Sequence, residues 1–123
     1  MTKRVLDVGQ CQMDHGTISN FLQAKFAAEV SRAHVAEDAL AELRRQPYDL
    51  VLVNRKLDRD YSDGLAIVRS MKADPALADV PVMLVTNYPD QQQIAVAAGA
   101  LPGFGKAELH TPETLERLRH ALA

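Results

Sequence analysis

The stretch DLVLVNRKLDRDYSDG, residues 49 to 64, joins an apolar run to an acidic loop. The run from Asp49 to Val53 is continuously apolar after its first residue, which is typical of a parallel strand that helices cover on both faces. It stops at Asn54, and the carboxylates come only later, at Asp58, Asp60 and Asp63. A buried strand therefore ends on a neutral amide.

Strand-like and helix-like segments alternate on both sides of this stretch. The expected strands are 5–8, 29–33, 49–53, 80–85 and 100–104, and the expected helices are 13–27, 36–43, 64–73, 90–98 and 112–122. Thr111 is the expected N-cap of the last helix, with Pro112 at its first position. A β-α unit repeated five times predicts right-handed crossovers and a five-stranded parallel sheet. We therefore expect one doubly wound, three-layer (βα)5 domain of flavodoxin-like architecture over residues 1–123.

Composition excludes several classes of protein. The chain has 123 residues, 47% of them hydrophobic and 24% charged, as in ordinary globular domains. A net charge of -2 gives no attraction to nucleic acid or to an anionic membrane. Cys11 is the only cysteine, which fits a reducing compartment, and no apolar run is long enough to span a bilayer. We expect a cytoplasmic domain that contacts neither nucleic acid nor membrane.

Doubly wound folds place their sites at the carboxyl ends of the strands. Gly9 and Gln10 follow the first expected strand, and Asn54 follows the third. Thr86 follows the fourth strand, and Lys106 follows the fifth. We expect these residues to converge on one shallow pocket at this edge of the sheet.

Several segments, in this order and spacing, resemble the receiver domains of two-component response regulators, which share the chemotaxis-regulator-like fold. They are RVLDVGQ (4–10), AEDALAEL (36–43), YDLVLVNRKL (48–57), ADPALADVPVMLVT (73–86) and AAGA (97–100). The resemblance covers essentially the whole chain. It implies phosphoryl transfer from a histidine kinase to an aspartate after the third strand, with Mg²⁺ held by two carboxylates after the first. A threonine after the fourth strand and a lysine after the fifth contact the phosphoryl group.

The chain departs from this pattern at the residues that carry the chemistry. The phosphoacceptor position is Asn54, whose neutral amide is a very poor nucleophile. The acidic pair is replaced by Gly9 and Gln10, and a site without carboxylates holds Mg²⁺ poorly. Thr86 and Lys106 match the family. We therefore expect no bound metal ion and no cofactor.

Two further positions of the pattern differ near the fifth strand. Ala107 stands where the family usually has proline after the lysine. The aromatic position that the family uses in switching aligns with Gly103. Phe104 is one residue along and, on the strand period of two, should point to the opposite face.

Nearby acids raise the question of compensation. Asp7 lies in the first strand, about 7 Å below Gly9, and either bonds to Lys106, a backbone amide or water, or neutralises Lys106 in place of the missing aspartates. Asp14 is explained by the favourable dipole at a helix start. The aspartates at positions 58, 60 and 63 form either a solvated loop or a weak cation site.

Three hypotheses for function follow. The first is a degenerate receiver domain that acts without phosphorylation, not as an enzyme, through protein partners such as a histidine kinase, an effector or an output domain. Its contact surface, and a possible homodimer interface, would be residues 87–122. The second is a response regulator that uses Asp58 or Asp60 as a surrogate acceptor. The third is a small enzyme that uses Cys11 with His15; the four scattered histidines do not favour a zinc site.

Overall fold

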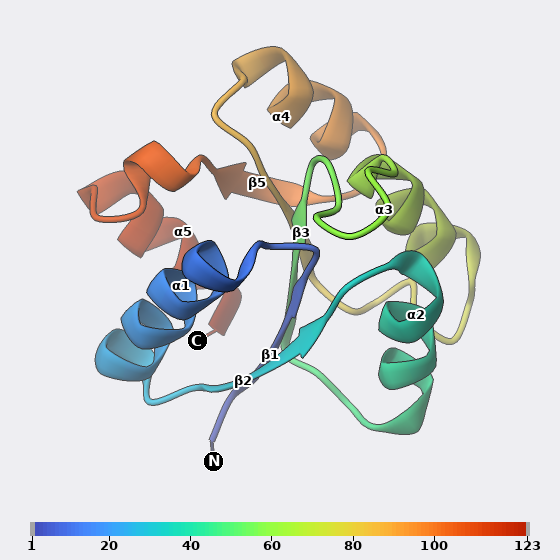
Figure 1. Ribbon diagram of the computed structural model, residues 1–123, viewed down its shortest axis with the longest axis horizontal. Coiled ribbons are helices and arrows are strands. Elements are labelled where there is room, and N and C mark those ends of the chain that lie inside the picture. Colours follow the sequence, from blue (N-terminus) through green and yellow to red (C-terminus); the bar gives the residue numbers. More distant parts are fainter. Residues whose placement is uncertain (1, 123) are drawn as a thin grey trace.

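The computed structural model describes residues 2–122, and its elements alternate as the sequence predicts (Figure 1). The strands are β1 (Arg4–Val8), β2 (Glu29–Ala33), β3 (Leu50–Asn54), β4 (Val82–Val85) and β5 (Leu101–Phe104). The α-helices are α1 (Gln12–Phe26), α2 (Ala36–Arg45), α3 (Gly64–Ala73), α4 (Pro89–Ala97) and α5 (Pro112–Leu122). A short 3-10 helix, η1 (Lys106–Glu108), precedes α5 and was not predicted.

All five strands are parallel and lie in the order β2-β1-β3-β4-β5. This order confirms the doubly wound α/β fold, since consecutive strands are joined by helices that cross over the sheet. The order reverses between β1 and β3, so their carboxyl ends flank the crevice where such folds place their sites.

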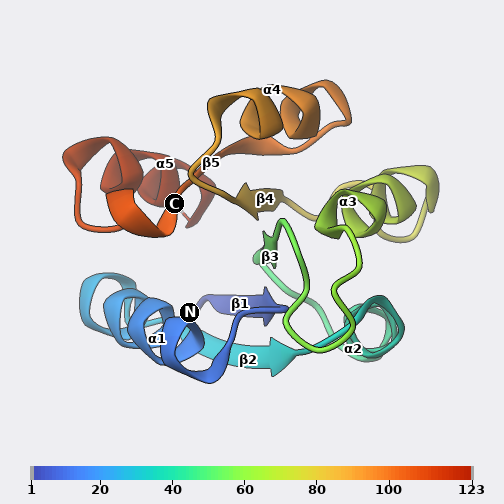
Figure 2. The ribbon, with the colours of Figure 1, turned by 45° about the horizontal axis from the view of Figure 1, so that its top comes forward.

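Helices cover both faces of the sheet, which gives the three predicted layers (Figure 2). On one face, alternate strand residues such as Leu6, Val51 and Leu84 pack against α2, α3 and α4. On the other face, residues such as Leu50 and Phe104 pack against α1 and α5. The first four residues of β3, from Leu50 to Val53, are fully buried, as the unbroken apolar run predicts.

The observed bounds differ from the expected ones by one or two residues. β4 begins at Val82 rather than at Val80, since Pro81 has no N–H to donate to a ladder. The Thr111 hydroxyl accepts a hydrogen bond from the Thr114 N–H at 3.3 Å, which confirms the predicted cap of α5. Among residues 2–122, no helix combines the length and the apolar character that a bilayer crossing requires.

Candidate functional site

The carboxyl ends of β3, β4 and β5 meet at a cleft of about 150 Å³. It is lined by Asn54, Arg55, Lys56, Val85, Thr86, Asn87, Tyr88 and Lys106. The structure therefore brings Asn54, Thr86 and Lys106 together, as the positions of the strand ends predict. Gly9 and Gln10 do not line this cleft.

The Asn54 side chain joins two loops. Its Nδ2 donates to the carbonyl oxygen of Gly9 at 3.2 Å and to that of Lys56 at 2.8 Å. Both partners are acceptors only, so the amide nitrogen, not the oxygen, must face them. The Gly9 oxygen also accepts from the Asp58 N–H at 2.9 Å. The amide thus connects the loop after β1 to the loop after β3 through hydrogen bonds that a carboxylate could not donate.

Gly9 occupies a position that admits no side chain. Its φ is +77°, in the left-handed region that favours glycine. A Cβ built there would lie 2.4 Å from Cδ2 of Leu57 and 3.1 Å from its Cα. Because Leu57 is itself fully buried, it has little room to move away. The next side chain, Gln10, is also fully buried, and its amide atoms make no hydrogen bond within residues 2–122.

Lys106 forms an ion pair with Asp14, with 2.8 Å between Nζ and Oδ2. The hydrogen bond from Lys106 is the main reason that the pKa of Asp14 is lowered. This pair ties the first turn of α1 to η1. The carboxylate that neutralises Lys106 is therefore that of Asp14. From the sequence, this residue was interpreted only as a favourable charge at the start of a helix.

Asp7 is not the partner of Lys106, so the prediction that it pairs with Lys106 or replaces the missing aspartates is wrong. Its Oδ2 lies 2.7 Å from Nδ1 of His15 in α1. Burial raises the pKa of Asp7 to about 6, although the bond to His15 and, more weakly, the adjacent Gln10 amide oppose the rise. The Gln10 amide lies near Asp7 without the geometry of a hydrogen bond. The prediction failed because Asp7 lies within β1, two residues before Gly9, and so does not reach the strand-end cleft.

Asp60 and Asp63 of the acidic loop form hydrogen bonds with residues close to them in the chain. Asp60 accepts hydrogen bonds from the N–H and the hydroxyl of Ser62, at 3.0 and 2.7 Å. Asp63 caps α3 by accepting from the Leu65 N–H at 2.9 Å. None of the loop aspartates lines the cleft. Within residues 2–122, no three His, Cys, Asp or Glu side chains are grouped so as to hold a metal ion.

Cys11 and His15 do not form a nucleophile–base pair. The Cys11 Sγ accepts from the Asp14 N–H at 3.5 Å and so acts as the N-cap of α1. Nδ1 of His15 is hydrogen-bonded to Asp7. The contact that joins Cys11 to His15 is the backbone bond of the first helical turn.

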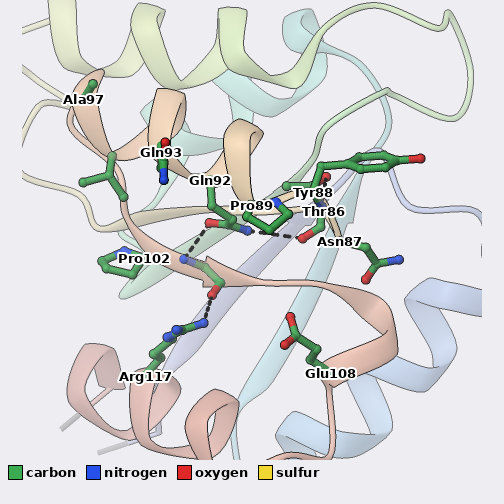
Figure 3. Close-up of a pocket in the computed structure, with 12 residues that line it drawn as sticks. Thr86, Asn87, Tyr88, Pro89, Gln92, Gln93, Ala97, Pro102, Glu108 and Arg117 are labelled. Carbon is green, nitrogen blue, oxygen red and sulfur yellow. Dashed lines mark hydrogen bonds between the residues drawn. The ribbon is translucent and has the colours of Figure 1, made fainter.

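The structure also shows a side-chain bridge that the sequence analysis did not find. One residue of β4, Leu84, faces two residues of the edge strand β5, so the ladder between these two strands is interrupted. Gln92 of α4 fills the gap: its Nε2 donates to the Leu84 oxygen at 2.8 Å, and its Oε1 accepts from the Gly103 N–H at 2.9 Å. Arg117 of α5 donates to the Gly103 oxygen at 2.7 Å (Figure 3).

Gly103 is the point at which α4, β5 and α5 are joined. A Cβ there would lie 2.2 Å from the Leu84 oxygen, so an aromatic side chain does not fit this backbone. Phe104 is buried on the opposite face, among residues of α1 and α5, as its strand parity predicts.

Two grooves flank this point on the face formed by α4, β5 and α5. One, of about 550 Å³, runs along α4, and the other, of about 700 Å³, runs along α5. Both are lined by Pro102 and Arg117, so they adjoin one another at β5. They lie within residues 83–120, close to the contact surface expected from the sequence.

Comparisons with known proteins agree with this architecture. The family model described as the response regulator receiver domain matches residues 12–108. A gliding motility regulatory protein of Myxococcus xanthus is 28% identical over 108 residues, which cover 86% of this chain and 14% of the relative. The transcriptional regulatory protein ZraR of Salmonella typhimurium is 29% identical over 111 residues, which cover 89% of this chain and 23% of the relative. The chain thus spans less than a quarter of the length of either relative.

Among solved structures, a response regulator from Chloroflexus aurantiacus superposes with a TM-score of 0.86 at 19% identity. The match covers 99% of this chain and 98% of that one, and at this identity it shows the fold alone. The family model, in contrast, spans most of the elements that build the cleft. The chain therefore belongs to the response regulator receiver domain family of two-component signalling.

Proposed function

We propose that this receiver domain accepts no phosphoryl group at position 54 and acts as a phosphorylation-independent protein-interaction module rather than as an enzyme. The observation that carries the proposal is the bonding of the Asn54 amide. It donates to the carbonyl oxygens of Gly9 and Lys56 and so has a structural role in the place where the family has its nucleophile. An amide with both N–H groups engaged offers no nucleophile to a phosphodonor.

The surroundings of Asn54 support the same conclusion. Phosphoryl transfer needs positive charge on the transferring group, which receiver domains recruit as Mg²⁺ through acidic side chains. Gly9 cannot carry a carboxylate without displacing Leu57, and the Gln10 side chain is neutral and buried. The oxygen ligands of a Mg²⁺ site are therefore reduced to neutral groups.

The interactions around Lys106 and Gly103 favour a single conformation. Asp14 supplies the anion that Lys106 otherwise meets in a phosphorylated site. Gln92 and Arg117 hold Gly103 from both sides, so α4, β5 and α5 are joined without any ligand. We infer that the face they form has a single conformation, in which its grooves are accessible without phosphorylation.

The partners are proteins that recognise this face. We propose a histidine kinase, an effector or an output domain, or a second copy of the chain through residues 87–122. Nothing in the proposal requires a cofactor, nucleic acid or a membrane, and we place the domain in the cytoplasm. The exposed Ile94 and Val96 on α4 supply apolar contact area beside the groove.

The test is exposure to acetyl phosphate with Mg²⁺, followed by intact-mass measurement, with a phosphorylatable receiver domain as positive control. We expect no added phosphoryl group under conditions that fully modify the control. A hydroxylamine-sensitive phosphoryl group at stoichiometric level would contradict the proposal. If it mapped to a peptide spanning residues 55–64, the surrogate-acceptor hypothesis for Asp58 or Asp60 would replace it.

A further inference from the structure

A polar cluster lies between β1, β2 and the start of α1, on the face of the sheet that α1 covers. The Asp7 carboxyl is fully buried, and its Oδ2 lies 2.7 Å from Nδ1 of His15 in α1. Arg32 is the partner of Asp7 in the register of β1 and β2, so the two side chains point to the same face. None of these three residues lines the cleft at the strand ends. The cluster is therefore a separate site.

The cluster contains buried polar atoms that no other residue satisfies. Asp7 Oδ1, Arg32 Nε and both amide atoms of Gln10 are buried and make no hydrogen bond within residues 2–122. A buried carboxylate with an unbonded oxygen is costly, whereas a protonated carboxyl carries no charge and can donate a hydrogen bond. Burial accordingly raises the pKa of Asp7 to about 6, although the bond to His15 opposes the rise. The site therefore favours retention of a proton.

The charged groups that face this carboxyl come from α1 and β2. They are His15 and Arg32, and Nη2 of Arg32 also donates to the Gln10 carbonyl oxygen at 3.2 Å. From β3, the register neighbour of Asp7 is Leu52, which is apolar and fully buried. The pair of Asp7 and His15 has no net charge when it shares one dissociable proton. After release of this proton to water, the pair is a buried anion that faces the single cation of Arg32.

The first turn of α1 is attached to the rest of the domain on two sides. His15 contacts Asp7 of β1, and the adjacent Asp14 forms the 2.8 Å ion pair with Lys106 of η1. The His15 N–H donates to the Cys11 carbonyl oxygen at 2.8 Å, which closes this turn. The His15 side chain is only 20% exposed and covers the carboxyl. Displacement of the turn would therefore both admit water to Asp7 and separate Asp14 from Lys106.

We propose that the Asp7–His15 pair is a proton-binding site whose occupancy controls the docking of the first turn of α1. With the proton bound, the pair is neutral and the turn is closed over Asp7. Loss of the proton leaves a buried negative charge, which favours an open turn in which water hydrates the carboxylate. Opening also weakens the ion pair between Asp14 and Lys106, so the effect of pH reaches η1, which leads into α5. The ligand of this site is the proton itself.

The direction and the size of the effect follow from linkage between proton binding and opening. In the closed turn, the pKa of Asp7 is raised from 3.8 to about 6, whereas a hydrated aspartate has a pKa of about 3.9. The closed turn therefore retains the proton to higher pH, and its stability relative to the open turn falls as the pH rises through this window. From pH 5 to pH 7.5, the ratio of open to closed molecules should rise about tenfold.

This inference does not rest on the proposal for Asn54. No phosphodonor enters the experiment below, and the proton site involves none of the residues that line the cleft except Lys106, through its ion pair. Failure of one proposal is therefore distinguishable from failure of the other.

The experiment is a pH titration of the ¹³C,¹⁵N-labelled domain, followed by NMR. The Asp7 carboxyl carbon should titrate with a midpoint of about pH 6, and the Lys106 amide should shift with the same midpoint. Hydrogen exchange of the His15 amide, corrected for the intrinsic effect of pH, should show protection that falls about tenfold from pH 5 to pH 7.5. An Asp7 midpoint of about 4, protection that is independent of pH, or a Lys106 signal that does not follow Asp7 would each overturn the proposal.

Three variants separate this site from other titrating groups. Asp7→Asn keeps the size of the side chain and should abolish the pH dependence of His15 protection. Asp90→Asn, the same change at an exposed carboxyl in the first turn of α4, should leave that dependence as in the wild type. His15→Leu removes the bond that lowers the pKa of Asp7, so the midpoint of Asp7 should rise. A pH dependence that persists in Asp7→Asn, its loss in Asp90→Asn, or an unchanged or lower midpoint in His15→Leu would contradict the proposal.

Discussion

Replacing Asn54 by aspartate is the most informative single change. The substitution keeps the size of the side chain but exchanges the N–H donors for a carboxylate oxygen. That oxygen would face the carbonyl oxygens of Gly9 and Lys56, now at 3.2 and 2.8 Å from Nδ2. Rotation of the carboxylate does not help, because both of its oxygens are acceptors.

The expected cost follows from these two bonds. Each contributes about 1 kcal/mol net, and an acceptor left facing a negative oxygen adds a further penalty of about 1 kcal/mol. Asn54→Asp should therefore lower the free energy of unfolding by about 2 to 4 kcal/mol at pH 7. A protonated carboxyl can donate one of the two bonds, so the native state raises the pKa of the new group. The cost should then shrink as the pH falls towards about 4, the value in unfolded chains.

The assay is urea unfolding of wild type and variant from pH 4 to pH 7, read as the difference between them. Asn87→Asp is the matched control: the Asn87 oxygen already accepts from the Ala107 N–H, and an aspartate preserves this bond. We expect the control to change the free energy of unfolding by less than about 1 kcal/mol.

The same variant tests the chemistry. Because Gly9 and Gln10 supply no carboxylate for Mg²⁺, Asn54→Asp should gain little phosphorylation from acetyl phosphate despite regaining a nucleophile. A variant as stable as the wild type at pH 7 and fully phosphorylated with Mg²⁺ would refute this reasoning.

The remaining predictions concern backbone fit, buried charge and the β4–β5 bridge. Gly9→Ala should cost about 2 to 3 kcal/mol of unfolding free energy, since its φ is +77° and a Cβ meets a buried side chain at 2.4 Å. Gly16→Ala, inside α1 with nothing within 4 Å, should instead add about 0.5 to 1 kcal/mol; urea titration compares the pair, and equal effects would contradict the steric argument. Asp7 has its pKa raised from 3.8 to about 6, so its native state binds more protons and its contribution to stability falls as the pH rises through this window. The free energy of unfolding of Asp7→Asn, relative to that of the wild type, should therefore increase by up to about 3 kcal/mol from pH 4 to pH 7. A difference between the two proteins that does not change with pH would rule out the buried carboxyl as the cause. Gln92→Ala should cost about 2 kcal/mol by leaving two backbone groups without partners. It should also speed amide exchange at Gly103, and unchanged exchange there would show that the bridge does not hold β5.

Periodicity and chain order were sufficient to predict the fold. The apolar run before Asn54 predicted a central strand covered on both faces, and the strand is fully buried. Strand parity also placed Phe104 correctly against α1 and α5. These features follow from local spacing, which a single sequence displays directly.

The composition of the site was predicted in part. The strand-end rule brought Asn54, Thr86 and Lys106 into one cleft, as the structure shows. It could not identify Asp14 as the partner of Lys106, because that contact depends on how α1 begins after the loop. The signal was present in the sequence, since Asp14 lies in the first turn of the helix that leaves the site, but Asp7 was preferred for its place in the strand.

The role of Gly9 was hidden for a similar reason. From the sequence alone, Gly9 indicates only that one carboxylate of the acidic pair is missing. The structure shows that Leu57, from the loop after β3, fills the space that a side chain would need. The Gln92 bridge likewise depends on a strand irregularity at Gly103, which spacing alone does not reveal.

We infer that the face formed by α4, β5 and α5 has one conformation, which a phosphodonor does not change. The most direct measurement is the ¹H–¹⁵N NMR spectrum of the domain with Mg²⁺, before and after addition of acetyl phosphate. We expect the amide signals of Gln92, Gly103 and Arg117 to keep their positions. A second set of signals for these residues, appearing with the phosphodonor and fading as it is consumed, would contradict it.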